Sequence, residues 1–400
     1  MKAVVCGAGI AGLTVANRLS ALGWSVVVLE KASGPRPQGY MIDFFGAGYD
    51  AAEAMGVLPQ VVEAGYRIRE ARLVDDAGRR RARMSFDQFG RSTGHRLVSI
   101  MRPDLESVLR ESLPGEVELR FATRPAGIDN GADGVRVTLD DGEVMRADLL
   151  VGADGIHSSV RRMVFGEERN HLRYLGFHTA AFTFDDPGIN AEIGDRFHLT
   201  DTIDRQLGLY GLRDGRLAVF AVHRAAEPGL PADPRAALLA EYGSLGWVVP
   251  GVLAKCPPVE ELYYDQVAQV EVSRWYRGRV VLVGDACAAV SLVAGQGASL
   301  GIAGAYVLAE QLRSGAVEAG LERYERLWQP VVAEKQRVAR RGIRWFLPHS
   351  RAELRLRHAV LALARTPGLD RFVATGLAGK HSTIVRQPHR KTPGGQRAWR

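Results

Sequence analysis

The stretch that decides the fold is Gly7-Ala8-Gly9-Ile10-Ala11-Gly12, which follows an apolar strand over residues 3–6 and opens a helix over residues 11–22. In a Gly-x-Gly-x-x-Gly loop, the first glycine makes a tight turn. The second lets a pyrophosphate approach the backbone, and the third lets helix and strand pack closely. A second apolar run, residues 26–29, leads into Glu30, eighteen residues after Gly12. Together these features predict a βαβ unit that binds a dinucleotide.

The expected ligand of this unit is FAD or NAD. The N–H groups at the helix N-terminus would bind phosphates, and Glu30 would accept hydrogen bonds from a ribose hydroxyl pair. Its carboxylate would repel a 2'-phosphate, so this site does not suit NADP. The predicted cofactor contacts of the segment are Gly7, Gly9, Ile10, Ala11, Gly12, Glu30 and Lys31.

A second glycine-rich segment favours a flavin. The apolar strand 279–283 delivers Gly284-Asp285, and a loop, Gly295-Gln296-Gly297-Ala298-Ser299, then enters another helix. This order would put the Asp285 carboxylate near a ribityl chain and a helix N-terminus near the flavin ring, whose reduced form carries negative charge that the helix dipole stabilises. A dehydrogenase needs neither feature.

A third segment, Gly152-Ala153-Asp154-Gly155-Ile156-His157-Ser158-Ser159, joins a buried strand to a serine-started helix. The order of the three segments resembles the single-component flavoprotein aromatic hydroxylases. These form the p-hydroxybenzoate hydroxylase-like family, and the likeness is strongest to its branch that modifies natural products or inactivates tetracyclines. The resemblance covers roughly residues 1–345.

The resemblance implies that FAD lies extended, from the Gly7–Gly12 loop and Glu30, past Asp285, to a ring against residues 295–301. It also implies flavin contacts for Arg36, Arg102 and Asp154. NADPH or NADH would dock transiently near the Asp-Gly segment, since no second dinucleotide fingerprint exists. Flavin halogenases share the opening motifs, but the sequence lacks their W-x-W-x-I-P motif.

The sequence departs from the family pattern beside the expected flavin ring. Ala288 stands where a histidine is usual, Leu292 where a proline is usual, and Ser299 and Gly304 replace the common Asn and Asp. These differences leave phosphate and ribityl binding intact. They bear on how the ring moves and how oxygen is positioned.

The rest of the chain predicts an α/β fold with an inserted β-rich region. Residues 135–139 and 143–146 form a hairpin around Asp140-Asp141-Gly142, and β-rich runs follow over residues 175–271. We expect a discontinuous Rossmann-like FAD-binding domain and an antiparallel substrate domain, followed by a C-terminal helical segment and a disordered basic tail. Their expected bounds are residues 1–70, 96–170 and 275–345 for the first, 71–95 and 171–274 for the second, 346–379 for the third and 380–400 for the tail.

Four side chains on the inserted strands are candidates to line a substrate cavity, because a flat organic substrate needs aromatic walls and a few polar anchors. They are His178, Tyr210, Phe220 and His223. Alternation turns about half of any strand inward, so a place in the protein core is the competing explanation for each. The ten histidines show no metal-ligand spacing, and we predict no metal and no catalytic triad.

Charge and composition exclude several classes of protein. The chain has 400 residues with a formal charge of +7, but residues 351–400 alone hold eleven Lys or Arg and two acids. These cations lack interleaved aromatic residues, so we predict no nucleic-acid partner. The uncharged run 286–309 contains four glycines and favours a buried helix over a membrane span. Three widely spaced cysteines fit a cytoplasmic protein, which we expect to be a monomer or weak dimer.

The sequence therefore predicts a monooxygenase that uses FAD, NAD(P)H and O2 to hydroxylate or epoxidise an aromatic or polycyclic small molecule. By resemblance, oxygen would add at flavin C4a to give a hydroperoxide. Two alternatives stay open: a flavin oxidase or reductase without oxygen insertion, and a ligand-binding protein that keeps FAD as a structural element. No base or proton relay is nominated by the sequence.

Overall fold

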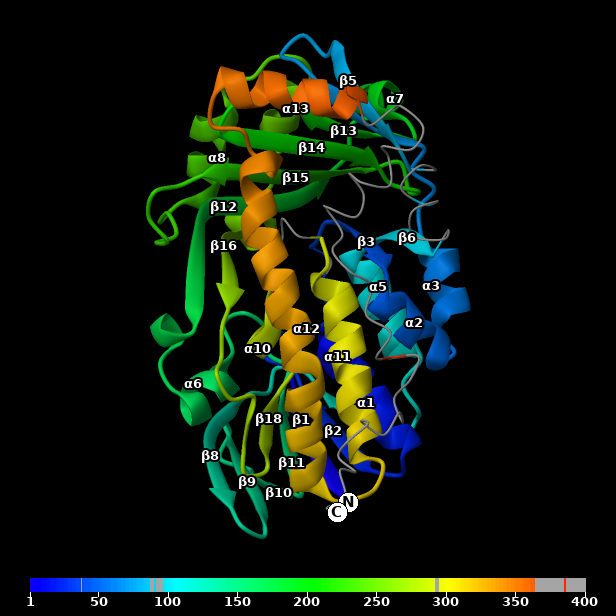
Figure 1. Cartoon of the computed structure of the whole chain (residues 1–400), viewed down its shortest axis with the longest axis vertical. Helices are drawn as coiled ribbons and strands as arrows, with labels where there is room; N and C mark the ends of the chain where they lie inside the picture. Colours follow the sequence, from blue (N-terminus) through cyan, green and yellow to red (C-terminus); the bar gives the residue numbers. More distant parts are fainter. Residues whose placement is uncertain (37, 87–89, 91–95, 292–294, 364–384, 386–400) are drawn as a thin grey trace, which may run out of the picture.

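The computed structural model describes residues 1–36, 38–86, 90, 96–291, 295–363 and 385. Two sheets organise this part of the chain. One carries the amino-terminal motif, and the other lies at the opposite end of the long axis (Figure 1). The mixed α/β architecture with a parallel sheet confirms the predicted fold class.

The first sheet has six strands in the order β17-β18-β11-β1-β2-β7. Four successive pairs, from β18 to β7, are parallel, and only β17 runs antiparallel to its neighbour β18. The inner strands are apolar and buried along their length, as is typical of a parallel sheet. The bounds are β1 (Lys2–Cys6), β2 (Ser25–Leu29), β7 (Glu118–Arg120), β11 (Leu149–Gly152), β17 (Tyr276–Arg277) and β18 (Val280–Leu282).

Helices from distant parts of the sequence pack around this sheet. Helix α11 is buried over most of its length between α1 and α12 (Figure 1). A Cβ on Gly304 of α11 would lie 2.5 Å from Trp328 Nε1 of α12, so the absent side chain permits this close contact. The bounds are α1 (Ile10–Ala21), α2 (Ala47–Ala54), α3 (Leu58–Ala64), α5 (Arg102–Glu111), α6 (Ser159–Phe165), α10 (Asp285–Ala288), α11 (Gly297–Leu312) and α12 (Val317–Phe346).

The second sheet has seven strands in the order β16-β12-β15-β14-β13-β4-β5. One of its faces packs against α8 and α9 in a core of its own, around Phe182, Leu209 and Tyr242. Helix α13 lies across the strands at the far end (Figure 1). The strand bounds are β4 (Glu70–Val74), β5 (Arg80–Ser85), β12 (Leu172–Phe184), β13 (Phe197–Thr200), β14 (Arg205–Gly211), β15 (Leu217–Arg224) and β16 (Tyr263–Val270). The helix bounds are α7 (Pro187–Ile193), α8 (Pro234–Tyr242), α9 (Val249–Ala254) and α13 (Arg351–Leu363).

Two smaller sheets complete the architecture. The predicted hairpin is confirmed as β9 (Gly134–Leu139) and β10 (Val144–Ala147), with β8 (Pro125–Gly131) added on the other side of β9. Strand β3 (Met41–Phe45) pairs with β6 (Leu97–Met101) between the two large sheets. Short 3₁₀ turns, Glu168–Asn170 and Val259–Glu261, lie in the connections.

The structure corrects several expected boundaries. The helix after the second glycine-rich loop begins at Gly297, within the segment expected to be a loop, so part of that loop forms its first turn. Pro330 lies inside helix α12, which continues on both sides of it. Strands β3, β8 and β13 were not anticipated. The domain boundaries given above stay a prediction, and the predicted tail, residues 380–400, lies outside the described residues apart from residue 385.

Within the described residues, no helix combines the length and the apolar character needed to cross a membrane. The run that resembled a span is divided between α10 and α11.

Candidate cofactor and substrate site

The Gly7–Gly12 loop is shaped by close backbone approaches. Gly7 has a φ of +106°, and a Cβ there would lie 2.4 Å from the carbonyl oxygen of Ala153. A Cβ on Gly12 would lie 1.9 Å from the carbonyl oxygen of Gly7. At Gly9 the nearest atom to such a Cβ is Glu106 Oε1 at 3.4 Å. The first and third glycines are therefore required by the fold, whereas the second leaves space above the helix N-terminus.

Glu30 directly follows β2 and lies beside this loop. Its carboxylate accepts the backbone N–H of Ala8 at 2.9 Å and that of Ala32 at 2.9 Å, and the residue is buried. These bonds fix the carboxylate at the loop, and its oxygens keep further acceptor sites for a ribose. The neighbouring Lys31 is exposed to solvent.

Arg102, the first residue of α5, lies over the same loop. Its Nη2 atom forms a 2.7 Å ion pair with Glu106 Oε1 and would be 3.9 Å from a Cβ on Gly9. Burial lowers the pKa of Arg102, but the Glu106 carboxylate and other acidic groups raise it by more, so the guanidinium stays charged. Arg36 is exposed to solvent. Burial raises the pKa of Glu106, and the charge of Arg36 is close enough to lower it in part. One cation, Arg102, thus lies beside Gly9, where we expect a pyrophosphate to approach.

The second motif meets the first directly. Gly284 has a φ of +61°, and a Cβ there would lie 2.6 Å from the Cβ of Ala11. Asp285 follows as the first residue of α10, and its Oδ1 would be 3.8 Å from a Cβ on Gly297 at the start of α11. The Asp285 side chain lies deep in the protein but remains accessible from the cavity described below. This burial raises its pKa, opposed by Arg102.

Two further residues of the glycine loop at the start of α11 are buried within the protein. Gln296, which precedes α11, is buried, as is Ser299. The Ser299 hydroxyl accepts the backbone N–H of Phe45 at 3.3 Å, which ties α11 to strand β3. Leu292, one of the departures from the family pattern, lies outside the described residues.

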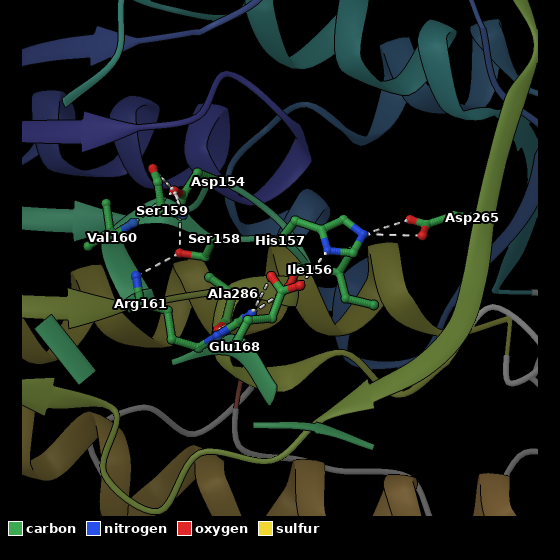
Figure 2. A network of polar contacts seen from close by, with 10 residues as sticks. All are labelled: Asp154, Ile156, His157, Ser158, Ser159, Val160, Arg161, Glu168, Asp265 and Ala286. Carbon is green, nitrogen blue, oxygen red and sulfur yellow. Dashed lines mark hydrogen bonds and ion pairs between the residues drawn. The ribbon is translucent and has the colours of Figure 1, made fainter. Parts of the chain in front are cut away.

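The Asp154 carboxylate lies at the start of helix α6. Its carboxylate accepts hydrogen bonds from the backbone N–H of Ser159 at 2.7 Å, the Ser159 hydroxyl at 2.8 Å and the backbone N–H of Val160 at 3.1 Å, and also from the Ser158 hydroxyl (Figure 2). These donors belong to the start of α6, so the carboxylate caps that helix. The backbone around Asp154 adjoins Gly7 and helps form the cavity wall, while the side chain supports α6.

One cavity joins all three motifs. It has a volume of about 180 Å³ and is partly open to solvent. Of the predicted cofactor residues, the cavity is lined by Gly9, Ile10, Ala11, Arg102, Asp285, Gly295, Gly297 and Ala298. Outside this lining are Gly7, Gly12, Glu30, Lys31, Arg36, Asp154, Gln296 and Ser299.

The opposite wall of the cavity comes from the seven-stranded sheet and contains residues that the sequence did not single out. Tyr263, Asp265 and Thr179 line it, and Tyr40 lines it from the segment before β3. The Tyr40 ring lies 6.1 Å from the Tyr263 ring and 5.8 Å from the Phe220 ring. Burial raises the pKa of both tyrosine hydroxyls, so they stay protonated hydrogen-bond donors at neutral pH.

The four predicted substrate residues separate into two pairs. Phe220 pairs in register with Ala181, and Tyr210 with Ala218, which places both on the sheet face that carries Tyr263. The Tyr210 hydroxyl meets the backbone N–H of Met41. Phe220 contacts Tyr40 of the cavity wall, and neither Phe220 nor Tyr210 is itself part of the lining.

His178 and His223 face the other side of the sheet. The Tyr264 hydroxyl lies 3.2 Å from His178 Nδ1 and 3.3 Å from His223 Nε2, and His223 Nδ1 lies 3.5 Å from the Tyr242 hydroxyl of α8. Burial lowers the pKa of His223 to about 4. The expectation that these histidines contact substrate is not supported by their position, which is within the core between the sheet and its helices.

Comparison with known proteins identifies the family of this fold. A family described as "FAD binding domain" matches residues 1–220 and 254–339. A flavin-dependent monooxygenase of Legionella longbeachae is 30% identical, with 84% of this chain and 87% of the relative covered. The FAD-dependent monooxygenase asL6 of Sarocladium schorii is 30% identical, with 93% and 94% covered. An uncharacterized Mycobacterium tuberculosis protein, MT1298, is 34% identical over 78% of this chain and 84% of its own length.

Solved structures agree with this result. The crystal structure of the tetracycline destructase Tet(51) has a TM-score of 0.78 and 25% identity, with 93% of this chain and 97% of that one covered. Klebsiella pneumoniae HpxO, complexed with FAD and uric acid, has a TM-score of 0.77 at 24% identity, covering 94% and 96%, and shows the shared fold. The chain belongs to the FAD-binding-domain family of flavin-dependent monooxygenases, which confirms the resemblance seen in the sequence.

Proposed function

We propose that this member of the FAD-binding-domain family hydroxylates or epoxidises an aromatic or polycyclic small molecule, using FAD, O2 and NADPH or NADH. The observation that carries the proposal is the convergence of three distant segments, at Gly9, Ala153 and Asp285, on one cavity. Its opposite wall is aromatic and supplies tyrosine hydroxyls.

The chain's own residues fit FAD. Gly9 leaves the space that a Cβ would partly fill, the N-terminus of α1 and Arg102 favour the pyrophosphate, and Glu30 is fixed where a ribose would lie. Asp285 would accept hydrogen bonds from ribityl hydroxyls, and the N-terminus of α11 would favour negative charge at the ring. When bound, the flavin supplies hydride acceptance and oxygen activation.

The protein's part in the reaction is to orient the substrate and exclude water. Tyr40 and Tyr263 provide flat apolar surface beside the expected ring position, and Phe220 supports the Tyr40 ring. The two hydroxyls can orient a polar substituent. Exclusion of water prevents the activated oxygen from being lost as hydrogen peroxide. The nicotinamide cofactor would enter from the open side, near the segment that holds Gly155 and Ile156.

The test is purification of the protein with FAD, followed by NAD(P)H oxidation assays with a panel of phenols and polycyclic compounds. We expect a yellow protein whose NAD(P)H oxidation accelerates with the correct substrate, and one atom of labelled O2 in the product. Faster oxidation with no label in the product would mean an oxidase or reductase. Bound FAD without NAD(P)H consumption across the panel would mean a ligand-binding protein.

A further inference from the structure

His157 connects the cavity to the protein surface. It lies in the connection between β11 and α6, and its Nε2 is 3.1 Å from Asp265 Oδ1 on β16, although the two residues are 108 positions apart. On its other side, Nδ1 lies 3.1 Å from Glu168 Oε1 (Figure 2). Asp265 is part of the cavity lining. A continuous line of ionisable groups therefore leads from the cavity to the outside.

Of the three side chains, Asp265 is the most shielded from solvent and His157 the most exposed. The Asp265 side chain is 11% exposed, that of His157 40% and that of Glu168 30%. Toward the cavity, Asp265 is close enough to Tyr40 and Tyr263 to affect their hydroxyls electrostatically. The inner end is thus shielded and faces the site, whereas the imidazole has direct contact with solvent.

Asp265 and Glu168, on either side of His157, are held in place by further contacts. The backbone N–H of Gln266 donates to Asp265 Oδ1 at 2.8 Å. Glu168 lies 3.4 Å from Nη2 of Arg161, whose fully buried guanidinium also donates to the carbonyls of Ile156 at 2.7 Å and Ala286 at 2.9 Å. The charged groups that face this line from the packed elements are therefore Asp265 of β16, Glu168 of the 3₁₀ turn and Arg161 of α6.

The electrostatics favour a protonated imidazole. The hydrogen bond to Asp265 is the main cause that raises the pKa of His157 above its usual 6.5, and it outweighs the effect of burial. A protonated His157 near neutral pH has a proton to give and solvent from which to recover it.

The proposed reaction needs a proton at the cavity. Hydroxylation of a substrate R–H by O2 and NAD(P)H consumes one H⁺ and yields R–OH, NAD(P)⁺ and H2O. Side chains can deliver this proton while water is kept away from the reacting atoms.

We propose that His157 and Asp265 form a proton relay between solvent and the flavin cavity, an inference that rests on the function proposed above. The imidazolium gives its Nε2 proton to the Asp265 carboxylate, which passes it to the cavity, and His157 then takes a proton from solvent. Glu168 and Arg161 are positioning residues that hold the imidazole. No bond other than N–H and O–H bonds is made or broken in the relay.

The experiment compares FAD-loaded wild-type protein with His157→Gln, His157→Ala and Asp265→Asn. His349→Gln is the matched control, because His349 also pairs with an aspartate, Asp204, at 2.7 Å but does not line the flavin cavity. Measurements are FAD affinity by fluorescence, the His157 pKa by NMR of the full chain, and the pH profile and solvent deuterium isotope effect of NAD(P)H oxidation.

We expect His157→Gln to retain FAD and to lose about 100-fold in substrate-stimulated oxidation, with a larger solvent isotope effect. Added imidazole should restore part of the rate in His157→Ala, and Asp265→Asn should bring the His157 pKa back toward about 6.5. His349→Gln should match the wild type.

Two results would overturn the relay while leaving the proposed function standing. One is unchanged rate and isotope effect in His157→Gln. The other is a lower rate that imidazole does not restore and whose pH profile is unshifted, which would make His157 a structural tether. Wild-type protein that binds no FAD would instead overturn the proposed function, and the relay with it.

Discussion

Replacement of Gly9 by alanine should weaken cofactor binding and leave the stability of the cofactor-free protein almost unchanged. In the structure, a Cβ at this position would meet Glu106 Oε1 at 3.4 Å and Arg102 Nη2 at 3.9 Å, which are ordinary contact distances. The Gly9 backbone, with φ −82° and ψ −176°, is open to any L-residue. Loss of unfolded-state entropy stabilises such a variant by about 0.4–1 kcal/mol, and the poorer helix cap costs a few tenths to about 1 kcal/mol. We therefore expect the thermal stability of the cofactor-free protein to change little.

FAD affinity should fall much more. If the pyrophosphate approaches the backbone at Gly9, the added methyl group occupies its path and removes close N–H contacts. Loss of one charge-assisted hydrogen bond, about 1.5–3 kcal/mol, corresponds to a roughly 10- to 100-fold weaker Kd. Quenching of FAD fluorescence on binding measures this directly, and Gly115→Ala, where a Cβ meets nothing within 4 Å, is the control. Unaltered FAD affinity in a folded Gly9→Ala protein would refute the assignment of this loop.

Three further outcomes follow from the same geometry. Gly12→Ala should lower the free energy of unfolding by roughly 1–3 kcal/mol or more, measured by urea denaturation, because its Cβ would lie 1.9 Å from the carbonyl oxygen of Gly7. Asp285→Asn should weaken FAD binding about tenfold or more without destabilising the cofactor-free protein, since it removes a carboxylate whose pKa burial raises. Because burial lowers the folded-state pKa of His223 to about 4, its neutral form is favoured. The contribution of His223 to the free energy of unfolding is therefore full above about pH 6.5, and it declines by roughly 3 kcal/mol as the pH falls to about 4. In chemical denaturation at several pH values, His223→Phe should make the free energy of unfolding depend less on pH over this range.

The cofactor half of the site could be predicted from the sequence because its signals are local. A glycine-rich turn after an apolar strand specifies both the strand end and the helix start. The carboxyl ends of parallel strands meet at one edge of a sheet, so the loops after β1, β11 and β18 had to be neighbours once all three were parallel. What local sequence could not give was the contact that joins them, between Gly284 and Ala11.

Strand alternation separates the candidate substrate residues into two groups. Phe220 and His223 are three positions apart on β15, so a regular strand turns them to opposite faces. They could not both face the same cavity. Which face covers the flavin depends on how β12 and β16 flank β15 and where α8 packs, and these are long-range contacts. Tyr40 and Asp265 were missed for the same reason.

Asp154 illustrates how one motif can serve two purposes. An aspartate followed by Ser158 and Ser159 at a helix start is also a capping pattern. In the structure, the Asp154 carboxylate accepts hydrogen bonds from the first turn of α6. That cap fixes the connection in which Ile156 contributes to the cavity wall and His157 reaches Asp265. The motif therefore acts on the cofactor site through its backbone and its histidine. An Asp154→Asn variant, which keeps some of the cap's hydrogen bonds, should disturb the His157–Asp265 pair less than Asp154→Ala, and the NMR pKa of His157 distinguishes the two.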